Sequence, residues 1–291
     1  MHPILFEIPG LNFPVRSFGV MVVAGFLIGT FLFNRLVARH TDDPAAQAEG
    51  FASLPIWVLV GVLAGARLMY VIVEILRGGE VGQSFLADPL KIFAYWEGGL
   101  VMYGGTFGGA AAGLWCAMRH RLNPWNALDM GMAAAFLGLA LGRIGCVLVG
   151  DDFGQIVPAA HESLPFPITL KVPDPLPEES LFGLANAGQT LYATQLWMSF
   201  NALMLSILGV LFLRLRRYPG QASLWLMLLY SVGRGTIEHF RGDDVRGVWF
   251  DGAVSTSQVI SIGLAFVCLG LLIKLRGRRT PIPGQGQPVA A

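Results

Sequence analysis

Residues 54–76 have the sequence LPIWVLVGVLAGARLMYVIVEIL, an almost wholly apolar run. A helix needs about 20 such residues to cross a hydrocarbon core of roughly 30 Å, so this run predicts a membrane-spanning helix. Lipid cannot satisfy backbone polar groups, which favours helices over open strands. Six further apolar runs lie near 18–35, 99–118, 129–149, 194–213, 222–240 and 257–274. The sequence therefore predicts an all-α polytopic membrane protein with about seven transmembrane helices.

The composition agrees with a membrane protein. Hydrophobic residues make up 54% of the 291 residues and charged residues 13%, about half the charged fraction of a soluble domain. Isolated apolar runs can be core helices of a soluble protein, but seven leave little room for that interpretation. The net charge is +1, and no basic stripe with interleaved aromatic residues indicates nucleic-acid binding. The three cysteines lie inside apolar runs without metal-ligand spacing, so we expect no metal site and no disulfide.

Basic residues between the runs predict the orientation. Eleven follow the first, third, fifth and seventh runs, and six lie on the opposite side. The six are Arg16, Arg77, Lys91, Lys171, Arg241 and Arg246. Cytoplasmic loops carry the excess of arginine and lysine. We therefore expect the N-terminus outside and the C-terminus in the cytoplasm, which requires an odd number of spans.

This orientation places the longest loop, about 150–193, outside the membrane as a small cap. It is acidic and contains several prolines. Residues 280–291 are rich in proline, glycine and glutamine and predict a disordered cytoplasmic tail. No internal repeat is evident, so residues 1–279 are expected to form one transmembrane domain.

Three arginines fall inside the apolar runs: Arg67, Arg143 and Arg234. A charge at a helix centre costs roughly 2.5–3.5 kcal/mol on insertion scales, so such a residue is a functional hypothesis by default. Glu238 follows Arg234 by four residues on the same helix face, where the two can pair. A purely structural interpretation is that Glu238 neutralises Arg234 and that Arg67 snorkels. One carboxylate cannot neutralise three guanidinium groups, however, and the remaining charge favours an anionic ligand such as phosphate.

Residues 142–154, GRIGCVLVGDDFG, strengthen this hypothesis. They place Arg143 near the outer end of the fourth run and Asp151 with Asp152 at its exit. A helix cap or external turn is the alternative explanation for the acidic pair. The glycines of YGGTFGG, residues 103–109, favour close helix packing, a role that needs no site.

At these residues the sequence resembles the prolipoprotein diacylglyceryl transferase family, over about residues 15–275. GRIGCVLVGDDFG resembles the family signature, which begins Gly-Arg-x-Gly and ends with an acidic residue and glycine. Weaker matches occur in the family order at 65–71, 96–109, 194–196 and 233–241, and at Gln258 with Ser261. Each is weak alone, but their number, order and spacing are specific.

The sequence also departs from the family pattern. Tyr103 stands where the family has histidine, and Cys146 where it commonly has asparagine. Phe18 replaces a tyrosine, while Ala193, Trp197 and Met198 replace proline, tyrosine and glutamate. A tyrosine phenol is a poor base at neutral pH, so the identity of the base is left open.

The resemblance implies a transferase of the bacterial inner membrane. It moves the diacylglyceryl group of phosphatidylglycerol to the cysteine thiol of a prolipoprotein signal peptide and needs no cofactor. The implied catalytic residues are Arg143, Arg234 and Tyr103. The implied phosphatidylglycerol-binding residues are Arg143, Arg67, Asp151, Gly154, Glu238, Arg241 and Gln258. Two alternatives stay open: a non-catalytic family member, and a transporter or lipid-binding protein that uses the same arginines without chemistry.

Overall fold

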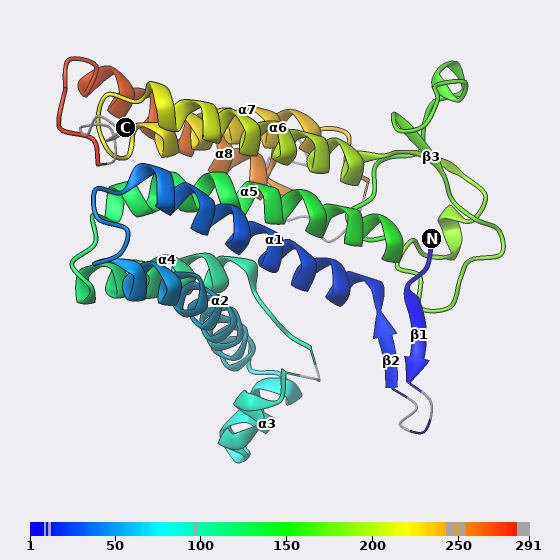
Figure 1. Ribbon diagram of the computed structural model, residues 1–291. Coiled ribbons are helices and arrows are strands. Elements are labelled where there is room, and N and C mark those ends of the chain that lie inside the picture. Colours follow the sequence, from blue (N-terminus) through cyan, green and yellow to red (C-terminus); the bar gives the residue numbers. More distant parts are fainter. Residues whose placement is uncertain (9, 11–12, 96–97, 243–247, 250–253, 284–291) are drawn as a thin grey trace. The chain divides into compact units, whose positions relative to one another are not determined.

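The computed structural model describes residues 1–283 apart from 9, 11–12, 96–97, 243–247 and 250–253 (Figure 1). Arg246, part of the charge count, and residues 284–291 of the predicted tail lie outside the described residues. The helices are α1 (Ser17–His40), α2 (Ala48–Arg77), α3 (Glu80–Ala87), η1 (Pro89–Phe93), α4 (Met102–Arg119), α5 (Pro124–Val149), η3 (Ala159–His161), η4 (Leu184–Asn186), α6 (Thr194–Leu215), α7 (Gln221–Glu238) and α8 (Thr256–Lys274). The strands are β1 (Ile4–Ile8), β2 (Phe13–Arg16), β3 (Thr169–Lys171), β4 (Thr190–Tyr192), β5 (Val248–Trp249) and β6 (Val254–Ser255).

Each of the seven predicted runs coincides with a long helix. Within the described residues, five helices are long and apolar enough to span a membrane: α1, α2, α5, α6 and α8. The chain is thus a mostly helical, multi-pass membrane protein. The other two long helices, α4 and α7, have 18 residues each and fall outside that set. Glycines dilute the apolar character of α4, and Arg234 with Glu238 reduce that of α7, so a count of seven spans stays a prediction.

The described residues also form three antiparallel two-stranded sheets outside the long helices, which the all-α prediction did not include. β1 pairs with β2 just before α1, and β5 pairs with β6 just before α8. β3 pairs with β4 inside the 150–193 loop. That loop also has a small hydrophobic core of Val172, Phe182 and Leu191. It is therefore an ordered element, and its external location stays a prediction.

The chain divides into two compact units, one of residues 1–40 with 128–291 and one of residues 41–127. In the first, α1 lies against α5 where glycines allow close approach: a Cβ on Gly25 would lie 2.7 Å from the carbonyl oxygen of Gly138. α5, α6 and α7 share a core of Phe136, Ala140, Ala202, Leu205 and Leu226. These contacts fix α5, the helix that carries Arg143. The prediction of one domain over 1–279 is not tested by this division.

In the second unit, α2 and α4 pack through paired glycines. A Cβ on Gly65 would lie 2.3 Å from the carbonyl oxygen of Gly104, and one on Gly61 would lie 2.4 Å from that of Gly108. Small residues four apart let two helices approach this closely. The close-packing interpretation of the YGGTFGG stretch is confirmed.

Candidate functional site

The site begins at Asp152, which lies in the loop after α5 and accepts two guanidinium groups. Arg143, from the last turns of α5, donates through Nη1 to Oδ2 of Asp152. Arg241, just beyond α7, donates through Nη2 to Oδ1 at 2.5 Å. Burial alone would raise the pKa of Asp152, but the charges of Arg143 and Arg241 outweigh it and hold that pKa below its usual range. Asp152 is therefore a carboxylate at neutral pH and joins two segments distant in sequence.

Glu238 extends the same network. It forms an ion pair with Arg234, four residues earlier on α7, which confirms the pairing expected from their spacing. Its Oε2 also lies 3.9 Å from Nε of Arg241. Arg234 in turn donates through Nη2 to Oγ of Ser257 at 3.3 Å. Glu238 is almost completely buried, with 1% of its side chain exposed.

Among the described residues, the network contains three guanidinium groups and two carboxylates, Asp152 and Glu238. Its five side chains are each no more than 24% exposed. Each guanidinium carries five N–H groups, and paired N–H donors of this kind suit the oxygens of a phosphate.

Gly154 and Asp151 fix the loop that carries Asp152. The N–H of Gly154 donates to the carbonyl oxygen of Tyr192 at 3.2 Å, and a Cβ on Gly154 would lie 2.3 Å from that oxygen. Only glycine permits this approach. Asp151 is exposed, and its Oδ1 accepts the backbone N–H of Asp152 at 2.9 Å. The acidic pair thus lies in the turn after α5, which is the alternative that the sequence left open. Asp152 in addition forms the ion pairs of the network.

The start of α6 holds the same loop. Thr194 donates through Oγ1 to the carbonyl oxygen of Asp152 at 3.0 Å, and Gln195 donates through Nε2 to that of Asp151 at 2.9 Å. Both side chains are buried, with 1% exposed. These two residues belong to the TQL segment that resembles the family, so the segment acts here by positioning the backbone of the acidic pair.

Arg67 makes its contacts within its own unit, residues 41–127. Its guanidinium donates to the carbonyl oxygens of Lys91 and Ile92 at 2.8 Å, and to those of Gly98 and Gly99 at 2.5 and 3.3 Å. Its Cζ also lies 5.4–5.8 Å from the ring centroids of Tyr70, Phe85 and Tyr95. It therefore fastens the segment after α3 to α2. A lipid phosphate would have to compete with these four carbonyl oxygens for the guanidinium of Arg67. The role of Arg67 in substrate binding stays a prediction.

Gln258 is engaged at the N-terminus of α8. Its Oε1 accepts the N–H of Ser255 at 2.9 Å, while Oγ of Ser255 accepts the N–H of Gln258 at 3.2 Å. This reciprocal arrangement is a capping box. Nε2 of Gln258 also reaches the carbonyl oxygen of Gly235 at 3.4 Å, one residue from Arg234. Gln258 thus ties α8 to α7 beside the network, and its contact with lipid stays a prediction.

Tyr103 lies in the first turn of α4, and 39% of it is exposed. It belongs to the unit of residues 41–127, whereas the arginine network lies wholly in the other unit. Its role in the reaction therefore stays a prediction.

A buried cluster around Asp129 was not indicated by the sequence. Its Oδ2 accepts Nη1 of Arg216 at 2.6 Å and the N–H of Gly220 at 2.8 Å. Its Oδ1 accepts the N–H and Oγ of Ser223 at 2.8 and 2.7 Å. Burial and then the Asp129 carboxylate raise the pKa of the nearby Tyr218 hydroxyl. A signal was available, because Asp129 is an acid at the start of a predicted span.

A second feature that the sequence did not indicate is an aromatic cluster formed by the 150–193 loop, the first turn of α6 and the segment after α7. The hydroxyl of Tyr192 lies 2.8 Å from Nδ1 of His161. The Tyr192 ring contacts those of Trp197 and Phe240, with centroids 5.6 and 5.4 Å apart. The backbone carbonyl of Tyr192 also accepts the N–H of Gly154. The cluster therefore supports the loop that carries Asp152.

Cys146, Asp151 and Asp152 present ligand atoms within 4.8 Å of one another. Asp152 already accepts two guanidinium groups, which repel a cation. We therefore assign no metal to this group.

Comparisons with known proteins agree on one family. A family model described as prolipoprotein diacylglyceryl transferase matches residues 3–274. A protein of Gloeobacter violaceus named phosphatidylglycerol–prolipoprotein diacylglyceryl transferase is 30% identical, over 92% of this chain and 91% of its own length. Proteins with that enzyme name from Clostridium perfringens (numbered 2 there) and Proteus mirabilis are 29% and 28% identical, over 96% and 97% of this chain and 98% and 95% of their own lengths. The arginines of the network lie in the stretches that resemble this family, at 142–154 and 233–241. The chain belongs to the prolipoprotein diacylglyceryl transferase family.

Proposed function

We propose that this protein transfers the diacylglyceryl group of phosphatidylglycerol to the lipobox cysteine of prolipoproteins, the first step of bacterial lipoprotein maturation. The observation that carries the proposal is the buried network of three guanidinium groups and two carboxylates. Guanidinium groups bind phosphate through paired donors, so a lipid with a phosphate head group fits this network. Family membership and the relatives' names support the same substrates.

The chemistry fits these residues. The cysteine thiolate attacks the glyceryl carbon that bears the phosphate, the carbon–oxygen bond breaks, and glycerol phosphate leaves with the electron pair. Arg143 and Arg234 hold the phosphate and stabilise charge on the departing oxygen. Glu238 orients Arg234 and accepts a hydrogen bond from the glycerol. The positive field of the network also favours the thiolate form of the attacking cysteine.

Turnover with labelled phosphatidylglycerol and a lipobox peptide tests the proposal. A thioether-linked diacylglyceryl peptide and free glycerol phosphate are expected. A non-catalytic family member would bind the lipid without releasing glycerol phosphate. A transporter would move lipid or anion across a vesicle membrane and leave the peptide unmodified. Lipid binding without release of glycerol phosphate, or transport without modification of the peptide, would contradict the proposal.

We infer that seven helices cross the bacterial inner membrane, with the N-terminus and the 150–193 loop outside. The eleven-to-six split of basic residues supports this orientation. Single cysteines at Glu178 and Arg279 test it with an impermeant maleimide on intact cells. Glu178→Cys is expected to react and Arg279→Cys to react only after lysis. The native cysteines are buried and provide the background control. Labelling of Arg279→Cys in intact cells would contradict the proposed orientation.

Substitutions at Tyr103, where the chain departs from its family, test whether this side chain takes part in the reaction. If the hydroxyl works in the site, Tyr103→Phe lowers turnover by at least about tenfold, or about 1.4 kcal/mol of transition-state stabilisation. Tyr103→His is expected to retain activity because it restores the family's usual residue. Turnover by labelled peptide assay, at matched expression, measures both. Equal rates for the phenylalanine variant and the native enzyme would show that the hydroxyl has no chemical role.

A further inference from the structure

Asn201 lies inside α6, and its amide donor is buried without an acceptor among the described residues. It follows Thr194, the first residue of α6, by seven positions, and α6 is one of the helices able to span a membrane. The Nδ2 atom of an asparagine carries two N–H groups. A buried amide donor without a partner is costly. Asn201 is therefore a candidate for binding a ligand.

Two serines of α6 show what a structural polar group does in this helix. Ser199 donates through Oγ to the carbonyl oxygen of Ala140 at 2.7 Å, and Ser206 donates to that of Ala133 at 2.8 Å. Both bonds join α6 to α5, as hydroxyl and amide groups commonly do between membrane helices. Within the described residues, Nδ2 of Asn201 takes part in no such bond. Helix packing therefore does not account for this amide donor.

Asn201 lies beside the arginine network, on the side of the membrane interior. Thr194, seven residues earlier on the same helix face, donates to the carbonyl oxygen of Asp152. Two turns farther along, about 10 Å at 1.5 Å per residue, the Asn201 amide contacts α7. A Cβ on Gly233 would lie 2.6 Å from Oδ1 and 2.9 Å from Nδ2 of Asn201. Consecutive Cα atoms are about 3.8 Å apart, so the amide lies next to the backbone of Arg234.

This depth indicates which chemical group can meet the amide. The charged groups of the network lie where α5 and α7 end. A phospholipid whose phosphate lies there extends its glyceryl esters, and then its acyl chains, toward the hydrocarbon core. The ester carbonyl oxygens accept hydrogen bonds, whereas the acyl chains have no acceptor. An ester carbonyl is therefore the group of such a lipid that an amide donor at this depth can bind.

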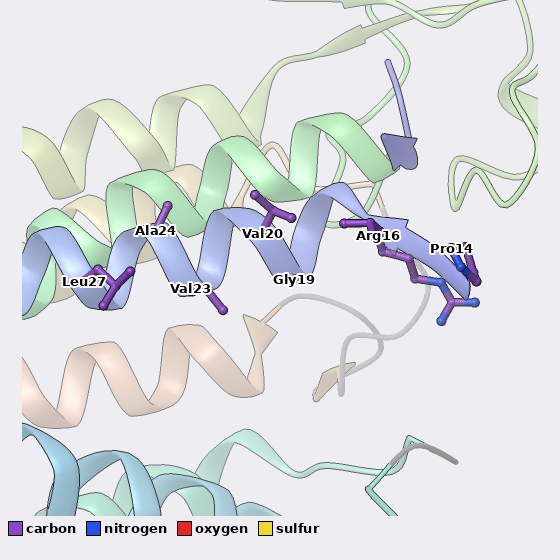
Figure 2. A pocket seen from close by; sticks show the side chains of 8 residues that line it. Pro14, Arg16, Gly19, Val20, Val23, Ala24 and Leu27 are labelled. Atoms are coloured by element: carbon purple, nitrogen blue, oxygen red, sulfur yellow. The ribbon is translucent and has the colours of Figure 1, made fainter. Parts of the chain in front are cut away.

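An apolar surface could not recognise that carbonyl. The lining of a hollow of about 710 Å³ along α1 includes Val20, Val23, Ala24 and Leu27 (Figure 2). Aliphatic side chains contact a fatty chain in the same way whether an ester or an ether joins it to glycerol. A buried amide donor does discriminate, because an ether has no carbonyl oxygen and would leave the donor unpaired.

We propose that Asn201 is a specificity-determining residue that donates a hydrogen bond from Nδ2 to an ester carbonyl of the diacylglyceryl group. This inference rests on the proposed function, because it takes the lipid held by the network to be the donor in the transfer. The arginines bind the phosphate that leaves, whereas Asn201 binds the part of the lipid that is transferred. Gly233 makes room for the amide, since a side chain there would collide with it.

Two donor lipids that differ in this carbonyl test the proposal. One is phosphatidylglycerol with ester-linked chains, and the other is its analogue with ether-linked chains of the same length. Turnover with a lipobox peptide gives kcat/KM for each. The native protein is expected to use the ester donor about tenfold better. Asn201→Leu is expected to use the ester donor about tenfold less well than the native protein and the ether donor at or above the native rate. The retained ether rate shows that this variant is folded.

Matched variants locate the effect. Ser199→Ala removes a hydroxyl of α6 that already donates to α5, and it should keep the preference for the ester donor. Gly233→Ala is an independent arm, because its Cβ would displace the Asn201 amide, the end of a flexible side chain. We expect it to reduce the preference to about twofold or less. Gly235→Ala is its control, since a Cβ there would lie 3.7 Å from Cβ of Ser261, an ordinary contact, and the preference should remain.

Turnover and binding together separate this inference from the proposed function. Binding of each lipid is measured by displacement of a fluorescent phosphatidylglycerol from the protein in detergent. If the native protein uses both donors equally, or if the preference survives in Asn201→Leu, the inference is overturned and the transfer reaction stands. An equal loss for both donors in Asn201→Leu would assign the residue to packing or to the peptide, and would also overturn the inference.

Absence of turnover with either donor would remove the proposed function. In that case, tighter binding of the ester lipid that is lost in Asn201→Leu would still support the inference. Equal binding of the two lipids by the native protein would overturn it.

Discussion

Replacing Arg143 with alanine is expected to abolish diacylglyceryl transfer while the protein still inserts and folds. Arg143 is one of three guanidinium groups in the network, and it lies at the signature stretch on α5. Loss of one preorganised donor to a developing oxyanion lowers turnover by about 10²–10³-fold. Here the change also leaves Asp152 with Arg241 alone, so the remaining phosphate site carries less positive charge. We expect turnover at or below the detection limit of the labelled peptide assay.

Two further variants separate charge from geometry at this position. Arg143→Lys keeps the charge but lacks the planar pair of donors, so it should also be poor. Arg77→Ala, which removes an exposed arginine 70% open to solvent, should turn over at the native rate. Monodispersity in detergent, measured on each variant, distinguishes lost chemistry from lost folding. Near-normal activity of well-folded Arg143→Ala would remove this residue from the mechanism.

Asp129→Ala is expected to produce the largest loss of stability. The carboxylate is fully buried and accepts four hydrogen bonds, from Arg216, Gly220 and Ser223. Gly220 is the N-cap of α7, so Asp129 closes the first turn of that helix from α5. Removing one partner of a buried ion pair costs about 3–5 kcal/mol. This corresponds to a fall in the unfolding midpoint on the order of 10 °C, which tryptophan fluorescence in detergent can follow.

The controls locate the source of this loss. Asp43→Ala removes one exposed carboxylate that accepts a single N–H, from Ala46, and should cost about 1 kcal/mol or less. Arg216→Ala should cost less than Asp129→Ala, because the carboxylate keeps its three bonds to Gly220 and Ser223. An Asp129→Ala midpoint equal to that of Asp43→Ala would show that the cluster does not stabilise the fold.

Local features of the sequence were sufficient to place the helices. The thickness of a bilayer sets the length of an apolar run, so each run predicted its helix without knowledge of its neighbours. The Arg234–Glu238 pair followed in the same way, because residues four apart on a helix are adjacent. The capping box of Ser255 and Gln258 is also local, and the pattern of serine and glutamine three apart could have revealed it.

Contacts between distant segments decided the rest. The sequence singled out Arg143 and Arg241, but Asp152 joins them only because the loop after α5 meets the end of α7, 89 residues later. Arg67 was grouped with the same arginines by its rarity in an apolar run, yet its guanidinium is occupied by carbonyl oxygens from the segment after α3. Its charge was visible in the sequence, whereas its partners were backbone atoms, which carry no residue signature.

By itself, then, the sequence determined the class of protein, the position of its long helices and the family to which its motifs point. These depend on hydrophobicity and spacing, which are properties of short segments. Only the tertiary structure decided which of the charged residues share a network. It joined Arg143, Arg241 and Arg234 through Asp152 and Glu238 and assigned Asp129 to the start of α7. The physical reason is that a buried charge is stabilised by whichever opposite charge or dipole folding brings within a few ångströms, and chain separation does not encode that partner.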